Sequence, residues 1–421
     1  MRLFDTYTKS LAELPAPPGP VRMYFCGPTV YARVHIGNAR PFVLGMWLRS
    51  WLSSRGYDVT LVHNITDVND KIYDAAPGAS AGLAEQATAW YLEDTGDLGL
   101  GMPDALPKVT DHIPQIVAFI GSLVEAGDAY PVNGDVYFRV KSFPEYGRLS
   151  GNKPDQMEDL EPNPLKEDPR DFALWKANKP GEDTAWDSPW GRGRPGWHIE
   201  CSAMAEELLG AAFEIHGGGL DLVFPHHENE LAQSRSLGHP FAQIWAHNGL
   251  LELTGEKMSK SAGNIASLRD VIDKWGRETI LVYFLTGLWR KPIDFSAATM
   301  EQAAAQAEAF RNVFRSESVA GGDWDALAAA LDDDFNTPEA LALMHGWRDH
   351  DLLRRGLEVF GLGSLAAGDE APPEIDLLAA RRQEARAAKD FAEADRLRDE
   401  LAAAGWEMRD EQGGYRLVRK R

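Results

Sequence analysis

The chain has 421 residues, of which 44% are apolar and 25% charged, and this is the composition of an ordinary globular protein of two to four domains. No stretch approaches the roughly 18 apolar residues of a membrane span, and the first residues lack the apolar core of a signal peptide, so we expect a cytoplasmic protein without membrane contact. The net charge of −21 argues against a general affinity for nucleic acid and leaves room for a local basic surface, such as residues 381–421, where basic side chains outnumber acidic ones.

The first elements in chain order predict a strand–helix–strand unit. Residues 21–25 read as a buried strand, residues 38–55 carry apolar side chains at helical spacing, and residues 59–65 read as a second strand. This order is a βαβ unit and implies a parallel sheet. Because ligands of such sheets bind beyond the carboxyl ends of the strands, we expect Cys26 and Thr66 to lie at a binding site.

The rest of the chain is predicted from composition and periodicity. Residues 76–135 look mostly helical, and residues 133–195 are a turn-rich insertion. Strands are expected at 213–216 and 244–247. From residue 297 onward the sequence is helical, with a linker at 366–373 before a last amphipathic helix that ends at Gly405.

Two segments suggest that a nucleotide is bound. His35-Ile36-Gly37-Asn38 lies where the first strand meets its helix, a place where backbone N–H groups receive phosphate; His35 and Asn38 add side-chain donors, and Gly37 permits close approach. Farther along, Lys257 and Lys260 in Lys-Met-Ser-Lys-Ser can neutralise charge on departing pyrophosphate. A structural histidine and a solvated surface loop are the alternatives. Together the two segments predict activation of a carboxylate with ATP.

A third group has the chemistry of a metal site. His226 and Glu230 are spaced i, i+4, so a helix would project both from one face, and the only two cysteines, Cys26 and Cys201, supply soft thiolate ligands. Two thiols with an imidazole and a carboxylate suit Zn²⁺. Spacing leaves two alternatives open: buried free cysteines without a metal, and His227 as the ligand instead of His226.

These segments belong to a longer set of motifs. The set includes Cys-Gly-Pro-Thr-Val-Tyr at 26–31, Asn-Ile-Thr-Asp-Val at 64–68, Gly-Arg-Pro-Gly-Trp-His-Ile-Glu-Cys-Ser-Ala-Met at 193–204, His-Gly-Gly-Gly at 216–219, Phe-Pro-His-His-Glu-Asn-Glu at 224–230 and Asp-Asp-Phe-Asn-Thr-Pro at 333–338. In these motifs the chain resembles the cysteinyl-tRNA synthetases, a family of the class I aminoacyl-tRNA synthetases, from near residue 3 to near residue 300 and again in the C-terminal helix.

The resemblance implies an α/β fold: a Rossmann-type parallel-sheet catalytic domain with an insertion, followed by a C-terminal helical bundle domain. The domains it implies are a first catalytic half at 1–115, a connective insertion at 116–195, a second catalytic half at 196–250, a stem-contact region with the Lys-Met-Ser-Lys-Ser loop at 251–296, and a helical tRNA- and anticodon-binding domain at 297–421.

The resemblance also implies roles for single residues. It places one zinc ion per chain on Cys26, Cys201, His226 and Glu230, where the metal would separate a thiol from a hydroxyl without an editing site. His35, Asn38, Lys257 and Lys260 are the implied catalytic residues. ATP, taken as its Mg²⁺ complex, would contact Gly37, His216, Gly217, Gly218, Gly219, Asp221, Met258, Ser259 and Ser261, and the amino acid would contact Thr29, Thr66 and Trp197. A tight turn at 216–219 and core packing of Trp197 are the alternatives.

The implied reaction activates L-cysteine with ATP and transfers it to tRNA-Cys, and we expect a monomer. Three features depart from the family: Asn38 replaces the usual last histidine of its motif, Asn69 stands where aspartate is common, and the helical C-terminal part is short. Two rivals remain. One is the related ligase that joins cysteine to a glucosaminyl-inositol in mycothiol synthesis, and the other is a binding module that has lost turnover through Asn38.

Overall fold

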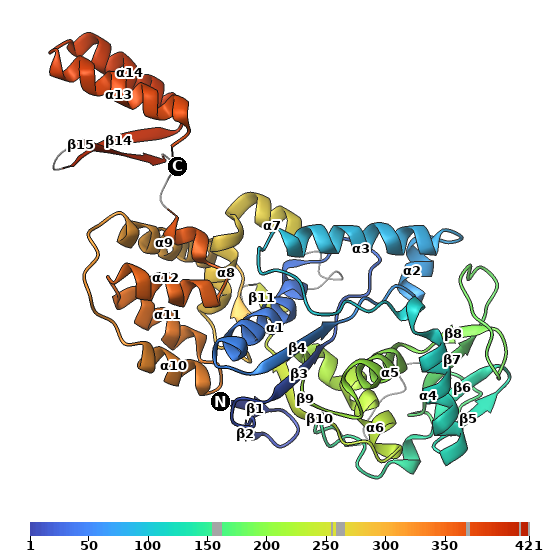
Figure 1. Ribbon diagram of the computed structural model, residues 1–421. Helices are drawn as coiled ribbons and strands as arrows, with labels where there is room; N and C mark the ends of the chain where they lie inside the picture. Colours follow the sequence, from blue (N-terminus) through green and yellow to red (C-terminus); the bar gives the residue numbers. More distant parts are fainter. Residues whose placement is uncertain (154–161, 254–255, 258–265, 368–370, 412–413, 420–421) are drawn as a thin grey trace.

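A computed structural model describes residues 1–153, 162–253, 256–257, 266–367, 371–411 and 414–419 (Figure 1). Its central sheet has the strand order β10-β9-β3-β4, formed by Phe241–Asn248, Ala212–Gly219, Pro20–Phe25 and Asp58–His63, and all three pairings are parallel. The predicted βαβ unit is therefore confirmed, with α1 (Ile36–Ser54) as its crossover helix. The run Gly217-Gly218-Gly219 continues strand β9 instead of turning after it, because each glycine pairs with a residue of β10.

Helix α1 joins the sheet to the helices that follow it in the chain. His35 is its N-cap, and Gly56, at a φ of 87°, follows its end as a left-handed residue that glycine adopts at little cost. The helix is apolar around most of its circumference, as a helix buried on several sides must be. Trp47 donates through Nε1 to the carbonyl of Phe360 at 3.0 Å, and the α1 side chains share one core cluster with the sheet and the helical region.

A second sheet, which the sequence did not predict, begins at the end of the run 76–135 that was expected to be mostly helical and continues through the turn-rich insertion. Strands β5 (Ala129–Val132), β6 (Asp135–Phe138), β7 (Phe172–Ala177) and β8 (Gly193–Pro195) pair in this order, and all pairings are antiparallel. Helices α4 (Ile113–Ala126) and α5 (Trp197–Leu209) pack beside it, and together they form a second core cluster. This cluster includes Cys26 and Cys201, so the two thiols lie where the insertion joins the central sheet.

The remaining elements surround these two cores. They are β1 (Arg2–Asp5), β2 (Ser10–Glu13), α2 (Asp70–Ala75), α3 (Ser80–Gly96), the short 3₁₀ turns Val109–Asp111, Val140–Ser142 and Leu220–Leu222, the π-helical turn Val223–His227 with α6 (Glu228–Ser236), β11 (Leu251–Leu253), β12 (Glu256–Lys257), α7 (Leu268–Trp275), α8 (Arg277–Leu285) and β13 (Ile293–Asp294). Strands β12, β11 and β13 form a small sheet in this order, next in the chain after β10.

The C-terminal part is helical as predicted, up to its last residues. Helices α9 (Ala297–Phe314), α10 (Trp324–Asp332), α11 (Thr337–Gly346), α12 (His350–Val359), the 3₁₀ turn Gly363–Ala366, α13 (Pro373–Ala387) and α14 (Phe391–Ala403) follow one another. The chain then ends in a hairpin of β14 (Trp406–Glu411) and β15 (Gly414–Arg419), so the expectation of helix to residue 421 is wrong there. Gly405 does follow the last helix in a left-handed conformation.

Helices α13 and α14 and the hairpin have a small core cluster of their own, which contains Ile375, Ala379, Leu401, Trp406 and Leu417. Figure 1 shows this unit in red, beyond the body of the molecule. Within the described ranges, no helix is both long and apolar enough to cross a membrane.

Candidate active site

A pocket of about 350 Å³ lies at the carboxyl ends of the central strands. Its wall is built from the segment after β3, the start of α1, the ends of β4, β9 and β10, and the first residue of α5; the lining residues are Cys26, Gly27, Pro28, Thr29, Tyr31, Ala32, Arg33, Val34, His35, Gly37, Asn38, Pro41, His63, Lys71, Trp197, Gly219, Asp221, Leu222, Asn248, Gly249, Leu250 and Leu251. Its position is the one expected for ligands of parallel sheets.

The segment His35-Ile36-Gly37-Asn38 forms the N-terminus of α1, as predicted. The Nδ1 atom of His35 accepts a hydrogen bond from the backbone N–H of Gly37 at 3.1 Å, which is a side-chain cap on the helix. A Cβ at Gly37 would lie 2.9 Å from the His35 ring, so the close approach that glycine permits here is to its own neighbour. The positive end of α1 and the Asn38 side chain are thereby presented at the pocket, where an anion is favoured.

The glycine run of β9 lies only partly in the pocket wall. Gly219 and Asp221 line the pocket, with the Asp221 carboxylate folded beside the Gly219 backbone. Gly217 and Gly218 instead sit where a Cβ would collide, at 2.3 Å from the Phe25 ring and 2.9 Å from Leu222. Absence of a side chain at these two positions is needed for packing inside the fold.

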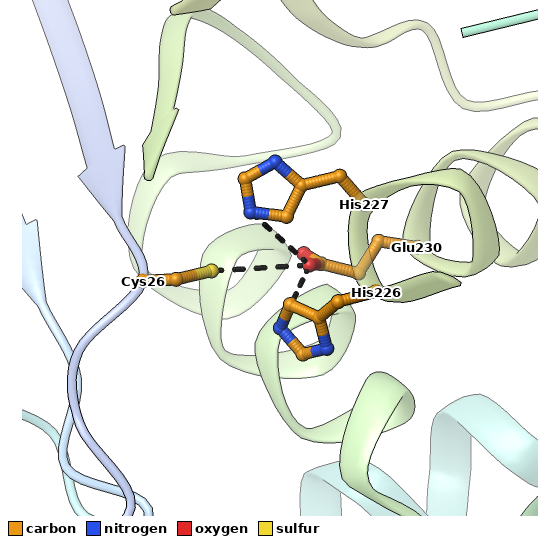
Figure 2. A group of neighbouring side chains, drawn as sticks. All are labelled: Cys26, His226, His227 and Glu230. Carbon is orange, nitrogen blue, oxygen red and sulfur yellow. Dashed lines mark hydrogen bonds and ion pairs between the residues drawn. The ribbon is translucent and has the colours of Figure 1, made fainter. Parts of the chain in front are cut away.

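Beside the pocket, three of the four predicted metal ligands, Cys26, His226 and Glu230, form a buried cluster with His227 (Figure 2). Donor atoms of Cys26, His226, His227 and Glu230 all lie within 4.8 Å of one another. The carboxylate of Glu230 is the centre: its Oε1 lies 3.1 Å from Nε2 of His226, 3.9 Å from Nε2 of His227 and 3.8 Å from Sγ of Cys26. Cys201 adds its sulfur 3.7 Å from that of Cys26. The compact set thus contains His227, which the sequence left as an alternative, in addition to three of the four preferred ligands.

His216 belongs to this cluster and lies outside the pocket wall as the structure describes it. Its Nε2 is 3.9 Å from Cys26 Sγ and 3.0 Å from Oε2 of Glu230, although the second contact lacks the alignment of a hydrogen bond. Burial lowers the pKa of His216 to about 3, so its ring is neutral. The predicted contact of His216 with ATP therefore has no support in its position.

Electrostatics in the cluster favour neutral side chains when no cation is present. Burial, with contributions from Cys201 and Glu230, raises the pKa of the Cys26 thiol well above its usual range, and burial raises the pKa of the Glu230 carboxyl likewise. Burial also lowers the pKa of His226 and of His227 far below the ordinary value. Neutral imidazole is the form that ligates metals.

The donor set fits a metal ion. Cys26 and Cys201 are buried free thiols, and among the described residues the Nε2 atom of His227 and the Oε2 atom of Glu230 have no hydrogen-bond partner although both are buried. Buried polar atoms without partners are costly, and a cation would satisfy several of them at once. Sulfur, nitrogen and oxygen donors in this proportion suit Zn²⁺.

Neighbouring side chains orient the two histidines. His226 shares a hydrogen bond of 3.0 Å between its Nδ1 and that of His198, and the ring of Trp197 stacks on it with centroids 4.3 Å apart. The Nδ1 atom of His227 meets Nε2 of His247 at 2.7 Å. Such contacts fix which ring nitrogen faces a metal. Trp197 also lines the pocket, so its ring lies between the cluster and the cavity.

Other predicted residues are placed as follows. Thr29 lines the pocket, whereas Thr66 is buried behind it, with its hydroxyl 3.4 Å from Glu200. Lys257 lies in β12, whose backbone pairs with Glu252 of β11. Met258, Ser259, Lys260 and Ser261 lie outside the described residues.

Sequence reasoning missed several residues of the pocket wall. His63 and Asn248 end the strands β4 and β10, and Lys71 lies in the first turn of α2, so the fold alone brings the three together. His63 and Asn248 could have been found as polar residues at strand ends, the signal that singled out Thr66. Lys71 had no such signal because it lies inside a short helix.

Solved structures of class I synthetases share the fold. The chain resembles the methionyl-tRNA synthetase of Mycobacterium tuberculosis in complex with methionyl-adenylate, with 15% identity, a TM-score of 0.60, and coverage of 82% of this chain and 88% of that one. A leucyl-tRNA synthetase from Agrobacterium radiobacter, in a ternary complex with tRNA, gives 12% identity, a TM-score of 0.54 and 83% coverage of both chains. At such identities the likeness establishes the class I aminoacyl-tRNA synthetase fold and nothing finer.

Sequence comparison is more specific. The family model described as the catalytic domain of class I (C) tRNA synthetases matches residues 14–305, a DALR domain matches 326–349, and the cysteinyl-tRNA ligase anticodon binding domain matches 368–416. A cysteine–tRNA ligase of Alkalilimnicola ehrlichii is 45% identical, with 94% of each chain covered, and one of Pseudothermotoga lettingae is 42% identical, with 97% covered. The chain belongs to the cysteinyl-tRNA synthetase family. These matches do not favour the amino-sugar ligase as the alternative.

Proposed function

We propose that the chain activates L-cysteine with ATP, releases pyrophosphate, and transfers the cysteinyl group to the 3′ end of tRNA-Cys. The observation that carries this proposal is the position of the Cys/His/Glu cluster: it lies beside a pocket whose rim is the N-terminus of α1, in a chain of this family. One site could therefore hold a sulfur-containing amino acid and a nucleotide together.

We propose zinc as the metal, held by Cys26, Cys201, His226 and Glu230. Bound there, zinc would accept the sulfur of cysteine as a thiolate, which the hydroxyl of serine cannot match. The chain's own residues shape the rest of the subsite. Trp197 covers His226 and lines the pocket, so its ring can exclude water beside the amino acid.

For the nucleotide, the start of α1 supplies backbone donors and His35 and Asn38 supply side-chain contacts to the phosphates of Mg²⁺-ATP. Asp221, which lines the pocket beside Gly219, would accept hydrogen bonds from the ribose hydroxyls. Lys257 and Lys260 would neutralise charge on the leaving pyrophosphate. No general base is required, because a carboxylate attacks the α-phosphate without losing a proton.

For the tRNA, we propose that residues 251–296 contact the acceptor stem and that the helical part from 297 onward binds the rest. The anticodon-domain match covers the unit built from α13, α14 and the terminal hairpin. Phe391, with 68% of its side chain exposed at the start of α14, offers a ring that can stack on an unpaired base.

Cysteine-dependent ATP–pyrophosphate exchange by the metal-loaded chain tests the activation step, and charging of a tRNA-Cys transcript tests the transfer. We expect exchange with cysteine at least about 10⁴-fold above that with serine. Equal rates with the two amino acids would reject the selection by metal. Absence of exchange in metal-loaded protein would support the binding module, and acylation of the glucosaminyl-inositol in place of tRNA would support the rival ligase.

A further inference from the structure

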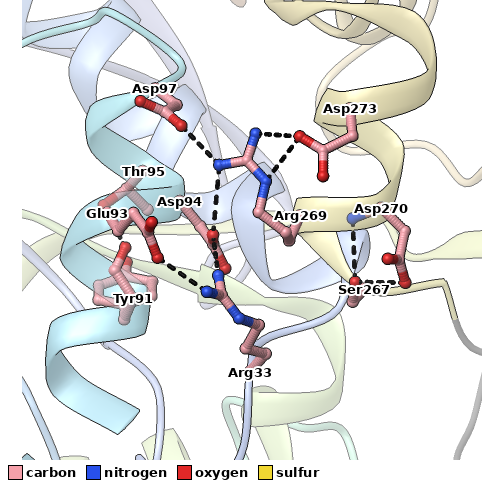
Figure 3. Close-up of polar contacts among 10 residues, drawn as sticks. All are labelled: Arg33, Tyr91, Glu93, Asp94, Thr95, Asp97, Ser267, Arg269, Asp270 and Asp273. Carbon is pink, nitrogen blue, oxygen red and sulfur yellow. Dashed lines mark hydrogen bonds and ion pairs between the residues drawn. The ribbon is translucent and has the colours of Figure 1, made fainter. Parts of the chain in front are cut away.

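Asp94, on helix α3, is a fully buried carboxylate placed between two arginines, Arg33 from the loop before α1 and Arg269 from α7 (Figure 3). Its Oδ1 accepts a hydrogen bond from Nη1 of Arg33 and lies 3.8 Å from Nη1 of Arg269. Its Oδ2 has no hydrogen-bond partner among the described residues.

The first arginine comes from the nucleotide-binding segment. Arg33 stands two residues before His35 and lines the pocket. Its guanidinium contacts α3 twice, through Asp94 and through a 2.8 Å ion pair with Glu93. The guanidinium group also lies over the ring of Trp90, with Cζ 5.5 Å from the ring centroid. These contacts tie the loop between β3 and α1 to helix α3.

The second arginine comes from α7, whose first residues follow the Lys-Met-Ser-Lys-Ser segment in the chain. Arg269 pairs at 2.5 Å with Asp97, the C-cap residue that follows α3, in addition to its approach to Asp94. It also contacts Asp273, at 2.6 Å, but this partner lies on α7 itself and cannot link α7 to anything else. Arg269 therefore ties the beginning of α7 to the same turn of α3 that holds Arg33.

Backbone contacts show that the two tied segments touch directly. The N–H of Ile36 donates to the carbonyl of Ala266 at 3.1 Å, and the N–H of Leu268 donates to the carbonyl of Val34 at 2.9 Å. The start of α1 and the start of α7 are thus neighbours with a fixed register at His35 and Ser267. Helix α3 braces this junction from one side.

Helix α3 also contacts the wall of the pocket, through Tyr91, one turn before Asp94. The hydroxyl of Tyr91 lies 2.5 Å from Nε2 of His63, and His63 is a pocket residue. Burial raises the pKa of the Asp94 carboxyl, and the hydrogen bond and charge of Arg33 oppose that rise.

We propose that Asp94 is a positioning residue, which holds Arg33 and Arg269 so that the start of α1, where ATP is received, keeps a fixed position relative to the start of α7. This inference rests on the proposed function, which assigns the His35–Asn38 segment to ATP. Removing the charge should leave cysteine binding intact, because Cys201, His226 and Glu230 lie on other elements and Cys26 lies at the far end of the loop from Arg33, and it should misplace the reacting phosphate.

The test is pyrophosphate exchange by the full-length Asp94→Asn variant. A misplacement of the order of 1 Å costs up to about 100-fold, so we expect kcat to fall about 10- to 100-fold and the KM for ATP to rise, while the KM for cysteine stays within about two-fold. Asp273→Asn is the matched control: it removes a carboxylate from the same arginine without breaking the link to α3, and its kinetics should equal those of the unmodified chain. Unchanged kcat and KM for ATP in Asp94→Asn would overturn the proposal.

Arg269→Met covers the case in which Asp94→Asn does not fold, because Arg269 lies at the surface with 21% of its side chain exposed. In Arg269→Met, too, the KM for ATP should rise while the KM for cysteine stays within about two-fold. Equal changes in the two KM values would overturn the proposal. Amide hydrogen exchange gives a readout without turnover: Ile36 and Leu268 should exchange faster in Arg269→Met than in Asp273→Asn, and equal rates would contradict the brace. If the unmodified chain did not activate cysteine, the proposed function would be wrong. The amide hydrogen exchange of Arg269→Met against Asp273→Asn would still test the positioning role of Asp94.

Discussion

The sulfur atoms of Cys26 and Cys201 lie 3.7 Å apart although 175 positions separate the two residues in the chain. Cys26 is the first residue after β3, and Cys201 lies on the first half of α5, after the insertion. Both are buried and free. Two thiols held side by side in this way, with Glu230 and two imidazoles as neighbours, form a place for a cation that neither half of the chain could build alone.

Replacing Cys201 by serine should remove the metal. A hydroxyl keeps its proton where a thiol would give it up, so the variant loses a ligand while its shape changes little. We expect less than about a tenth of the metal of the unmodified chain and a fall of about 100-fold or more in cysteine-dependent exchange. Elemental analysis measures the first quantity. Binding of an ATP analogue, followed by calorimetry, should be unaltered, and metal at one equivalent in Cys201→Ser would remove Cys201 from the ligand set.

Two adjacent histidines can be told apart by the same measurement. His226 lies closer to Oε1 of Glu230 than His227 does, at 3.1 Å against 3.9 Å, and Trp197 stacks on it beside the pocket. We therefore expect His226→Asn to abolish metal binding and His227→Asn to retain it. His239→Asn is the control, since His239 pairs with Glu206 away from the cluster. Metal retained in His226→Asn and lost in His227→Asn would reverse the assignment.

The parallel sheet and the cluster could be predicted from sequence for definite physical reasons. Strand-like runs separated by a helical run leave little choice but a parallel pair, and the i, i+4 spacing of His226 and Glu230 puts both on one helix face. In contrast, the antiparallel sheet at 129–195 is made of short strands broken by turns, and each strand is stable only against its neighbours. The contact between Arg269 and Asp94 likewise joins residues far apart in sequence, so no local sequence pattern predicts it.

The insertion offers a test of pH dependence. Asp168 accepts from Arg170 at 2.8 Å and 2.9 Å and meets Lys141 at 2.9 Å, and these cations, Arg170 above all, hold the pKa of its carboxyl well below the ordinary value of 3.8. A lowered folded-state pKa contributes stability that is present above pH 3.8 and is lost as the pH falls below it through the folded-state pKa.

Asp168→Asn should therefore lower the free energy of unfolding by about 1–2 kcal/mol at pH 7. The difference from the unmodified chain should persist to pH 5 and shrink below pH 3.8. Urea unfolding across this range measures it. Glu167→Gln, whose carboxylate pairs with Arg139 at the surface, should have a smaller effect at every pH. A difference that grows on acidification would show that the carboxylate is not the stabilising form.

Gly27 holds Cys26 in place by leaving room for Asn64, and alanine there should disturb the whole cluster. A Cβ at Gly27 would lie 1.6 Å from the carbonyl oxygen of Asn64, and that residue's side chain accepts from the Gly27 N–H at 2.9 Å. The backbone must shift, and Cys26 with it, so we expect Gly27→Ala to lose metal and about 1–3 kcal/mol of stability. Gly82→Ala, on α3 with no described atom within 4 Å of its new methyl group, should instead gain about 0.4–1 kcal/mol. Thermal unfolding and metal content of the two variants test this, and full metal content in Gly27→Ala would show that the Cys26 turn yields without moving its sulfur.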